Sequence, residues 1–132
     1  MMETEKHILL SSKAIAVVGL SPNIDRSSYK VSSYLQQQGY RIIPVNPSTS
    51  EILGEKCYPH ISSIPEPVDM VDIFRPSEEV LSIVKEAIDS GVKFIWMQEG
   101  IMNQTAAEYA TDCGIPVVMD KCTLKEHKRL ST

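Results

Sequence analysis

A chain of 132 residues is long enough to form one domain with a buried core, without help from a metal ion or disulfides. Its composition, 42% hydrophobic and 23% charged, is typical of a globular protein, and its net charge of −4 provides no overall basic field for nucleic acid or an anionic membrane. No apolar run approaches the roughly 20 residues that span a bilayer, and the first residues make a poor signal peptide. We therefore expect one cytoplasmic domain, residues 1–132, that binds neither nucleic acid nor membrane.

The cysteines are Cys57, Cys113 and Cys122, an odd number with neither a CxxC motif nor the spacing of Cys/His metal ligands. This pattern argues against a secreted disulfide framework and against a structural zinc site. We expect free thiols in a reducing compartment and no metal.

Three segments share one pattern: an amphipathic stretch, a single glycine and a short apolar run. The glycines are Gly39, Gly91 and Gly114. A glycine directly after a helix is the usual left-handed cap, because it has no Cβ to clash. The runs that follow are too short for helices and rich in branched or aromatic side chains, as buried parallel strands are. Each segment therefore predicts a helix, its cap and a central strand.

Extended to the whole chain, the pattern predicts strands at residues 14–18, 41–45, 70–74, 94–97 and 116–119. It predicts helices at residues 6–11, 28–38, 77–90 and 104–112, and a polar helix from residue 123. Ser77 and Asn103 are predicted N-caps of two of these helices. The loop at residues 46–67 is long, and we expect Ile61 and Ile64 to pin it to the core.

Strands that alternate with helices of this length predict right-handed βαβ units and a parallel sheet covered on both faces. The fold class is therefore α/β: a Rossmann-like three-layer α/β/α sandwich with a five-stranded parallel sheet. The leading strand order is 3-2-1-4-5, as in the dinucleotide-binding fold, and the flavodoxin-like order 2-1-3-4-5 is the alternative.

Ligands of such sheets bind beyond the carboxyl ends of the strands, where the strand order reverses. The polar residues directly after the strands are therefore the candidate site: residues 19–22, 46–47, 75–76, 98–100 and 120–122. Arg75 either pairs with a ligand phosphate or is a plain surface residue. Glu99 either accepts hydrogen bonds from a ligand or caps the following helix.

The turn after the first strand, residues 19–28, has one glycine where a GxGxxG fingerprint has three, which argues against an NAD-type dehydrogenase. The turn still supplies what a pyrophosphate needs: hydroxyls from Ser21, Ser27 and Ser28, the cation of Arg26, and N–H groups at the start of a helix. The alternative is that Ser27 or Ser28 only caps the helix while Arg26 is solvated.

Six short motifs occur in order along the chain: Ala-Val-Val-Gly-Leu-Ser with Arg26-Ser27-Ser28, Ile-Pro-Val-Asn46-Pro47, Ile52-Leu53-Gly54 with Cys57-Tyr58, Val71-Asp72-Ile73-Phe74-Arg75, Trp96-Met97-Gln98-Glu99-Gly100, and Met119-Asp120-Lys121-Cys122. Together, from about Ser11 to Leu130, they resemble the stand-alone CoA-binding proteins. These are relatives of the N-terminal CoA-binding domain of the succinyl-CoA synthetase α-subunit.

The resemblance implies that the ligand is coenzyme A or an acyl-CoA. It implies that the pyrophosphate is held by the turn of Gly19, Leu20 and Ser21 together with Arg26, Ser27 and Ser28. It implies that Asn46 and Pro47 border the adenine and ribose, that Phe74 and Arg75 lie beside the nucleotide, and that Gln98, Glu99 and Gly100 line the path of the pantetheine arm.

The chain also departs from the synthetase. The phosphorylated histidine of that enzyme belongs to a further domain, and the phosphate-contacting lysine after its second strand is replaced here by Ser48, Thr49 and Ser50. The histidines of this chain show no spacing typical of a nucleophile, a base and an orienting partner.

We therefore expect a binding or regulatory protein rather than an enzyme, with a protein partner or a homo-oligomer left open. The alternatives are an NAD or ADP sensor, a thiol enzyme that uses Cys122 beside Lys121, and a protein-interaction module.

Overall fold

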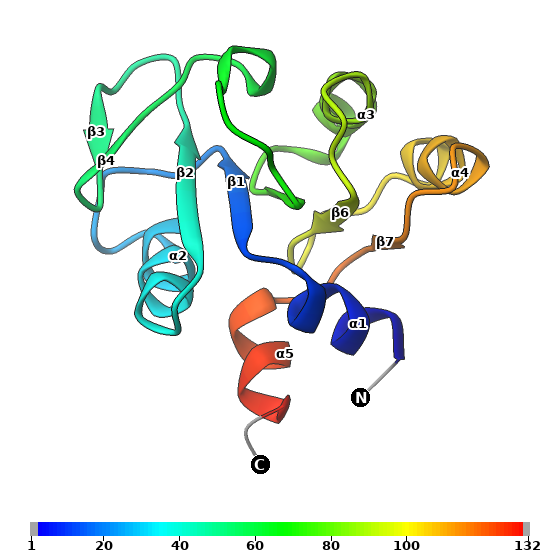
Figure 1. Cartoon of the computed structure of the whole chain (residues 1–132), viewed down its shortest axis with the longest axis horizontal. Coiled ribbons are helices and arrows are strands. Elements are labelled where there is room, and N and C mark those ends of the chain that lie inside the picture. The colour runs from blue at the N-terminus through cyan, green and yellow to red at the C-terminus, as the bar shows by residue number, and fades with distance from the viewer. Residues whose placement is uncertain (1–2, 131–132) are drawn as a thin grey trace.

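Residues 3–130, the part of the chain that the computed structural model describes, alternate between strands and helices (Figure 1). The strands of the main sheet are β1 (Ala14–Val18), β2 (Arg41–Val45), β5 (Met70–Ile73), β6 (Phe94–Met97) and β7 (Val117–Val118). The helices are α1 (Glu3–Ser11), α2 (Ser27–Gln37), α3 (Val80–Asp89), α4 (Gln104–Asp112) and α5 (Thr123–Leu130). The long loop carries a small hairpin, β3 (Glu51–Ile52) and β4 (Glu55–Lys56), and a 3₁₀ turn, η1 (Ile61–Ser63). None of the helices in this part is long and apolar enough to cross a membrane.

Alternate side chains of the sheet face two helical layers. Ala16 and Val18 of β1 pack in the cluster that includes α3 and α4, whereas Ile15 and Val17 pack in the cluster that includes α1, α2 and α5. Figure 1 shows the two groups of helices on opposite sides of the sheet. This alternation is the period of two expected for strands buried on both faces. The predicted Rossmann-like α/β/α sandwich with a parallel sheet is confirmed.

The order of the strands differs from the leading prediction. The sheet runs β2-β1-β5-β6-β7, which is 2-1-3-4-5 when the predicted strands are counted along the chain. The order 3-2-1-4-5 is therefore wrong, and the flavodoxin-like alternative is the observed one. Because β1 pairs with β2 on one side and with β5 on the other, the point where the order reverses lies between β1 and β5.

The reason for this order lies at the outer edge of β2, which the long loop occupies. Tyr58 forms a parallel bridge with Val45, in which its N–H donates to the oxygen of Pro44 at 3.0 Å and its oxygen accepts from the N–H of Asn46 at 2.9 Å. Pro44 turns its carbonyl to this edge, so its missing N–H removes no hydrogen bond to β1. A full strand at this edge would need that N–H. The loop covers the position that the predicted order gave to the third strand.

Most element ends lie within a few residues of the prediction. The three capping glycines have positive φ, between 77° and 100°. Asn103 is the N-cap of α4, since its Oδ1 accepts a hydrogen bond from the N–H of Ala106 at 2.9 Å. Ile61 is buried and Ile64 packs against the core, as predicted for the long loop.

The prediction that Ser77 caps a helix is wrong. The first turn of the predicted helix is a 3₁₀ turn, η2 (Ser77–Glu79), and α3 begins only at Val80. The hydroxyl oxygen of Ser77 accepts instead from the N–H of Met102 at 3.1 Å, so Ser77 joins this turn to the segment before α4. A tertiary contact therefore replaces the local cap.

One carboxylate lies inside the sheet. Asp72 of β5 is fully buried, on the face that α1, α2 and α5 cover. Its Oδ1 accepts from Gln98 Nε2 at 2.7 Å, and its Oδ2 accepts from Thr123 Oγ1 at 3.2 Å. Burial raises the pKa of Asp72 to about 7, although both hydrogen bonds act in the opposite direction.

Between about pH 4 and pH 7, the folded protein binds more protons at Asp72 than the unfolded chain does. We therefore expect this residue to lower the free energy of unfolding as the pH rises through that range. The decrease is at most about 4 kcal/mol, because one pKa unit corresponds to about 1.4 kcal/mol. Asp72→Asn should remove this decrease in urea unfolding curves recorded at a series of pH values.

The matched control is Asp89→Asn, which neutralises an exposed carboxylate at the end of α3. This variant should keep the wild-type dependence on pH. The same dependence in Asp72→Asn and in wild type would contradict the assignment of the proton uptake to Asp72.

Candidate functional site

The carboxyl ends of β1 and β5 lie directly against each other. Gly19 follows β1 with a φ of 89°, and its N–H donates to the oxygen of Val45 at 3.1 Å. A Cβ at this position would lie 2.8 Å from the backbone oxygen of Phe74 and 2.9 Å from Cδ of Arg75. Only glycine combines this φ with so close an approach. The turn after β1 therefore lies beside Arg75, at the point where the strand order reverses.

The turn from β1 to α2 is held by its own polar groups. The N–H of Ser21 donates to Ser28 Oγ at 3.0 Å, and Ser21 Oγ accepts from the N–H of Asn23 at 3.1 Å. α2 begins after Arg26 without a side-chain cap, so neither Ser27 nor Ser28 caps it. The first N–H groups of α2 and the positive end of its dipole therefore remain available to an anion.

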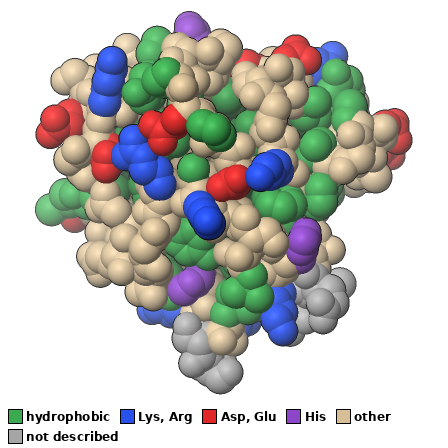
Figure 2. All heavy atoms as spheres, in the orientation of Figure 1, with side chains coloured by type: hydrophobic (Ala, Val, Ile, Leu, Met, Phe, Trp, Pro, Cys, Tyr) green, Lys and Arg blue, Asp and Glu red, His purple; other side chains and the backbone are tan. Residues whose placement is uncertain are grey.

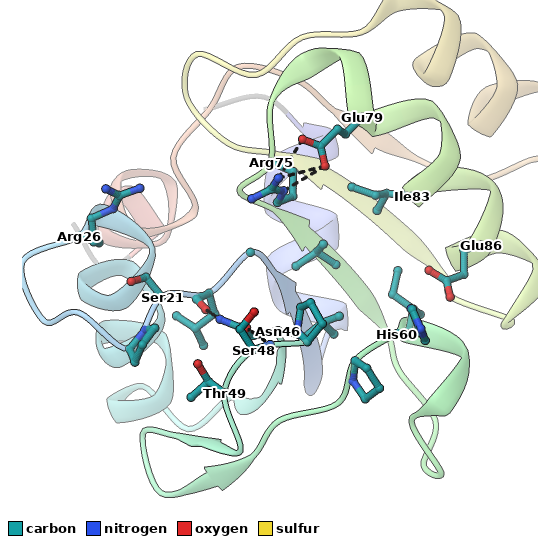
Figure 3. A pocket seen from close by; sticks show the side chains of 18 residues that line it. Ser21, Arg26, Asn46, Ser48, Thr49, His60, Arg75, Glu79, Ile83 and Glu86 are labelled. Carbon is teal, nitrogen blue, oxygen red and sulfur yellow. Dashed lines mark hydrogen bonds and ion pairs between the residues drawn. The ribbon is translucent and has the colours of Figure 1, made fainter.

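This turn forms one wall of a cavity of about 810 Å³, which we call the first cavity. Figure 3 shows Ser21, Asn46 and Thr49 on the side of α2, His60 and Glu86 on the opposite side, and Arg75 with Glu79 between the two sides. The volume is within the range of small-molecule sites. The predicted site residues that line the first cavity are Gly19, Leu20, Ser21, Arg26, Asn46, Pro47 and Arg75.

The two arginines of the first cavity differ in their partners. Arg75 donates from Nη2 to both carboxylate oxygens of Glu79, at 3.1 and 2.9 Å. Arg26 is exposed and makes no ion pair with any residue in the described part of the chain. In Figure 2, basic side chains lie beside acidic ones on the visible face. Among the described residues, the positive charges at the first cavity are confined to these two arginines, and two acidic residues, Glu79 and Glu86, line it as well.

Asn46 links the ends of β1 and β2. Its Nδ2 donates to the oxygen of Leu20 at 3.0 Å, and its Oδ1 accepts from the N–H of Ser48 at 2.8 Å. Leu20 also lines the cavity, although the residue is buried in the core. Asn46 therefore shapes the wall of the cavity by holding two loops together.

A second cavity of about 250 Å³ lies beyond the ends of β5 and β6. Four predicted site residues, Ser27, Phe74, Gln98 and Glu99, line it, and so does Cys122. Glu99 forms an exposed ion pair with Lys125 at 3.0 Å, and the N-cap of the helix that follows it is Asn103 rather than Glu99. Because Arg26 lines the first cavity and Ser27 the second, the start of α2 lies between them.

Two predicted site residues line neither cavity among the residues described. Ser28 is buried, and its hydroxyl holds the turn through Ser21. Gly100 has a φ of 84°, and its N–H donates to Asp120 Oδ1 at 2.6 Å. Both residues hold the loops of the site in place through these hydrogen bonds rather than by lining a cavity.

The first cavity also includes residues that the sequence pattern did not indicate. Pro59, His60 and Ile61 come from the long loop, and Ile83 and Glu86 come from α3. The loop residues follow Tyr58, whose pairing with β2 brings them to the carboxyl edge. The residues of α3 lie at i, i+3 spacing from each other, but no sequence signal shows which end of a helix faces a site.

The arrangement combines helix N–H groups, an exposed arginine and hydroxyls at a strand switch point, with a smaller cavity next to it. Together, the fold and the cavities define a Rossmann-like domain whose candidate ligand site lies at the carboxyl edge of its sheet. The chain belongs to the CoA-binding domain family, whose model matches residues 13–128. The resemblance inferred from the motifs is thereby confirmed.

Comparisons with individual proteins agree with this family. The chain is 41% identical over 122 residues to the Bacillus subtilis protein YneT, covering 92% of this chain and 90% of that protein. A solved structure of a hypothetical protein from Pyrococcus horikoshii OT3 superposes with a TM-score of 0.94 at 38% identity, covering 98% of this chain and 92% of that one. The ADP-forming acetate–CoA ligase II of Archaeoglobus fulgidus is 37% identical over 87 residues, which are 64% of this chain but only 13% of the ligase.

The close approach at Gly19 can be tested by Gly19→Ala. The added methyl group meets backbone and a strained φ, so we expect a loss of about 1–3 kcal/mol in the free energy of unfolding, measured with urea. Gly54→Ala is the matched control, because Gly54 has a φ of 75° but no atom within 4 Å of the position that a Cβ would take. It should show only the cost of the φ, about 1 kcal/mol. Equal losses in the two variants would mean that the close approach to Phe74 and Arg75 contributes nothing.

Proposed function

We propose that this chain binds coenzyme A or an acyl-CoA along the carboxyl edge of its sheet, as a binding or regulatory protein rather than an enzyme. The observation that carries the proposal is the first cavity at the β1/β5 switch point, lined by the uncapped start of α2 and by two arginines. Membership of the CoA-binding domain family supports the choice of ligand. So does the similarity to an acetate–CoA ligase.

The first cavity takes the anionic end of the ligand in this proposal. The pyrophosphate lies at the turn of Gly19 and Ser21, where the N–H groups of α2 and the guanidinium of Arg26 meet it. The adenine and ribose lie against Asn46 and Pro47, on the wall that these residues form.

Arg75 binds a second phosphate of the ligand, which replaces the carboxylate of Glu79 as the partner of its guanidinium. The Arg75–Glu79 ion pair is roughly half exposed, and exposed pairs contribute only about 0–1 kcal/mol. A phosphate can therefore take over the guanidinium at little cost. Until then, Glu79 keeps Arg75 at the rim beside Gly19.

The second cavity takes the neutral arm of the ligand. The arm passes over the start of α2, from Arg26 in the first cavity to Ser27 in the second. Phe74 offers an apolar wall there and Gln98 a polar one. Both arginines line the first cavity, and none of the described residues that line the second is basic. This distribution of cations suits a polyanionic nucleotide with a neutral, amide-containing arm.

A thiol-dependent activity is the second candidate function, because Cys122 lines the second cavity. This half-buried residue lies on the path assigned to the arm, where its thiolate could attack a CoA disulfide, form a mixed disulfide and release one CoA thiol. The histidines lie in separate places: His60 lines the first cavity, His127 accepts or donates a hydrogen bond with the hydroxyl of Tyr34, and His7 packs edge-on against Phe94.

Thermal unfolding with CoA, dephospho-CoA, acetyl-CoA, NAD and ADP tests the proposal. A ligand that binds only the folded state stabilises it by about 2.7 kcal/mol at one hundred times its Kd. We expect CoA or acetyl-CoA to raise the unfolding temperature more than NAD or ADP do. A shift with NAD alone would favour a nucleotide sensor of another kind and overturn the proposal.

The same series with Cys122→Ser separates binding from thiol chemistry. The shift with CoA should be nearly unchanged in this variant if Cys122 only packs against the arm. Loss of the shift, together with a CoA adduct on the wild-type protein in a mass spectrum, would favour the thiol candidate.

Arg26 is the residue whose removal should weaken CoA most directly. Because it has no protein partner in the described part of the chain, its guanidinium is available to the pyrophosphate. We expect Arg26→Ala to weaken binding by about 1–3 kcal/mol in titration calorimetry, as for other lost charge-assisted contacts.

Lys30→Ala is the control, since Lys30 is exposed on the same helix and its loss changes the net charge by the same amount. It should leave the dissociation constant within a factor of about two, because separated surface charges are largely screened. An equal effect of both substitutions would reduce the role of Arg26 to general electrostatics.

A further inference from the structure

The polar groups around Asp72 form a closed triangle. Gln98 Nε2 donates to Asp72 Oδ1 at 2.7 Å and to Thr123 Oγ1 at 2.8 Å, and Thr123 Oγ1 donates to Asp72 Oδ2 at 3.2 Å. Asp72 belongs to β5, Gln98 directly follows β6, and Thr123 is the first residue of α5. All three are at least nine-tenths buried.

The carboxylate determines every direction in this triangle. Above its pKa of about 7, Asp72 is ionised and only accepts hydrogen bonds, so the amide of Gln98 must then turn its NH₂ group toward Asp72. Thr123 must likewise point its hydroxyl hydrogen at Asp72, which leaves its lone pair for Gln98. Without the carboxylate, either end of the Gln98 amide could face the triangle.

The amide oxygen of Gln98 is consequently the end of the side chain that the triangle leaves free. Gln98 lines that cavity, although only 3% of the residue is exposed. Its Oε1 has no hydrogen-bond partner in the described part of the chain. In the described part of the chain, the side-chain atoms that are fully enclosed and lack a partner are Glu5 Oε2 and Ser32 Oγ. Oε1 of Gln98 is not one of them, so it is not fully enclosed. Oε1 is therefore an acceptor that is open to the cavity and held in one direction.

We propose that Asp72 is a positioning residue that fixes the amide of Gln98 with its oxygen toward the second cavity, and that the site thereby selects an arm that presents an N–H donor. This inference rests on the proposed function, because it concerns the arm of the same ligand. A buried carboxyl group in the middle of a parallel strand is a poor choice for stability, since taking a polar group out of water has a free-energy cost that its hydrogen bonds only offset. The orientation that the triangle imposes on the Gln98 amide gives a reason for keeping a group that lowers stability.

The test is run at a pH well above the pKa of Asp72, so that the carboxylate is ionised. It compares CoA with analogues in which each amide N–H of the arm is replaced in turn by an ester oxygen. An ester presents only acceptors, so it leaves Oε1 of Gln98 without a donor. For the analogue whose ester lies opposite Gln98, we expect wild-type protein to bind CoA about tenfold more tightly than it binds the ester. This is the typical effect of leaving a buried acceptor without a donor. In Asp72→Asn, the Gln98 amide can turn, and the preference should fall below about threefold.

The nucleotide half of CoA, without the arm, provides the reference ligand. Its dissociation constant should be the same in wild type and Asp72→Asn, because it does not reach Gln98. Asp89→Asn, with the same change at an exposed site, should keep the full preference for the amide. Thr123→Val removes one of the two acceptors of Gln98 Nε2 and should give an intermediate preference, which keeps the test available if Asp72→Asn folds poorly.

The failures of the two proposals are distinguishable. If neither CoA nor its nucleotide half binds to wild-type protein, the proposed function and this inference both fall. If CoA binds but the preference for the amide is equal in wild type, Asp72→Asn and Thr123→Val, only the positioning role of Asp72 is overturned. A purely structural role of Asp72 would lower the affinity for amide and ester alike and would leave their ratio unchanged.

Discussion

The carboxyl ends of β1 and β5 approach each other so closely that a Cβ at residue 19 would meet the backbone of Phe74 at 2.8 Å. This approach brings the turn after β1 and the arginine after β5 to one point of the sheet. Ser21 and Ser28 then hold the turn, and the uncapped start of α2 comes to lie at the rim. The first cavity depends on this geometry, because its walls are the segments that follow β1, β2 and β5.

The elements of this fold could be predicted from the sequence, because each is a short pattern with a local cause. The glycines after α2, α3 and α4 end helices, and the apolar runs after them form strands. The order of the strands does not follow from these local patterns. The residue in the sequence that indicates it is Pro44. A proline inside a strand is tolerated mainly at the edge of a sheet, and this places the second strand at the edge rather than between its neighbours.

That order also moves the centre of the site. With 3-2-1-4-5, the reversal would lie between β1 and β6, so Gly19 and Gln98 would share one pocket. With the observed order, Gly19 lies beside Arg75, and Gln98 lines a second cavity on the other side of the start of α2. The candidate residues were predictable as strand ends, but their division between two cavities was not, because it depends on which strands are neighbours. Contacts between elements that are distant in sequence could not be predicted from local patterns either.

The pairing of Tyr58 with β2 and the turn of Ser77 toward Met102 are such tertiary choices, and they replace an expected strand neighbour and an expected helix cap. The 3₁₀ turn that results places Glu79 where it can bind Arg75. The charge of that arginine is therefore partly compensated within the protein, whereas Arg26 has no such partner in the described part of the chain.

Asp72 is unusual already in the sequence, but the sequence does not show which residues it contacts. A carboxylate in the apolar run Met70-Val71-Asp72-Ile73 breaks the pattern of a buried strand, since unpaired acids are almost never fully buried. The break is visible in the sequence, but its partners, Gln98 and Thr123, follow only from the neighbouring positions of β6 and α5. The first cavity is built from exposed arginines and helix N–H groups, which attract any phosphate. In the function proposed above, the buried triangle is the group that distinguishes one neutral arm from another, because it fixes the amide of Gln98 before a ligand arrives.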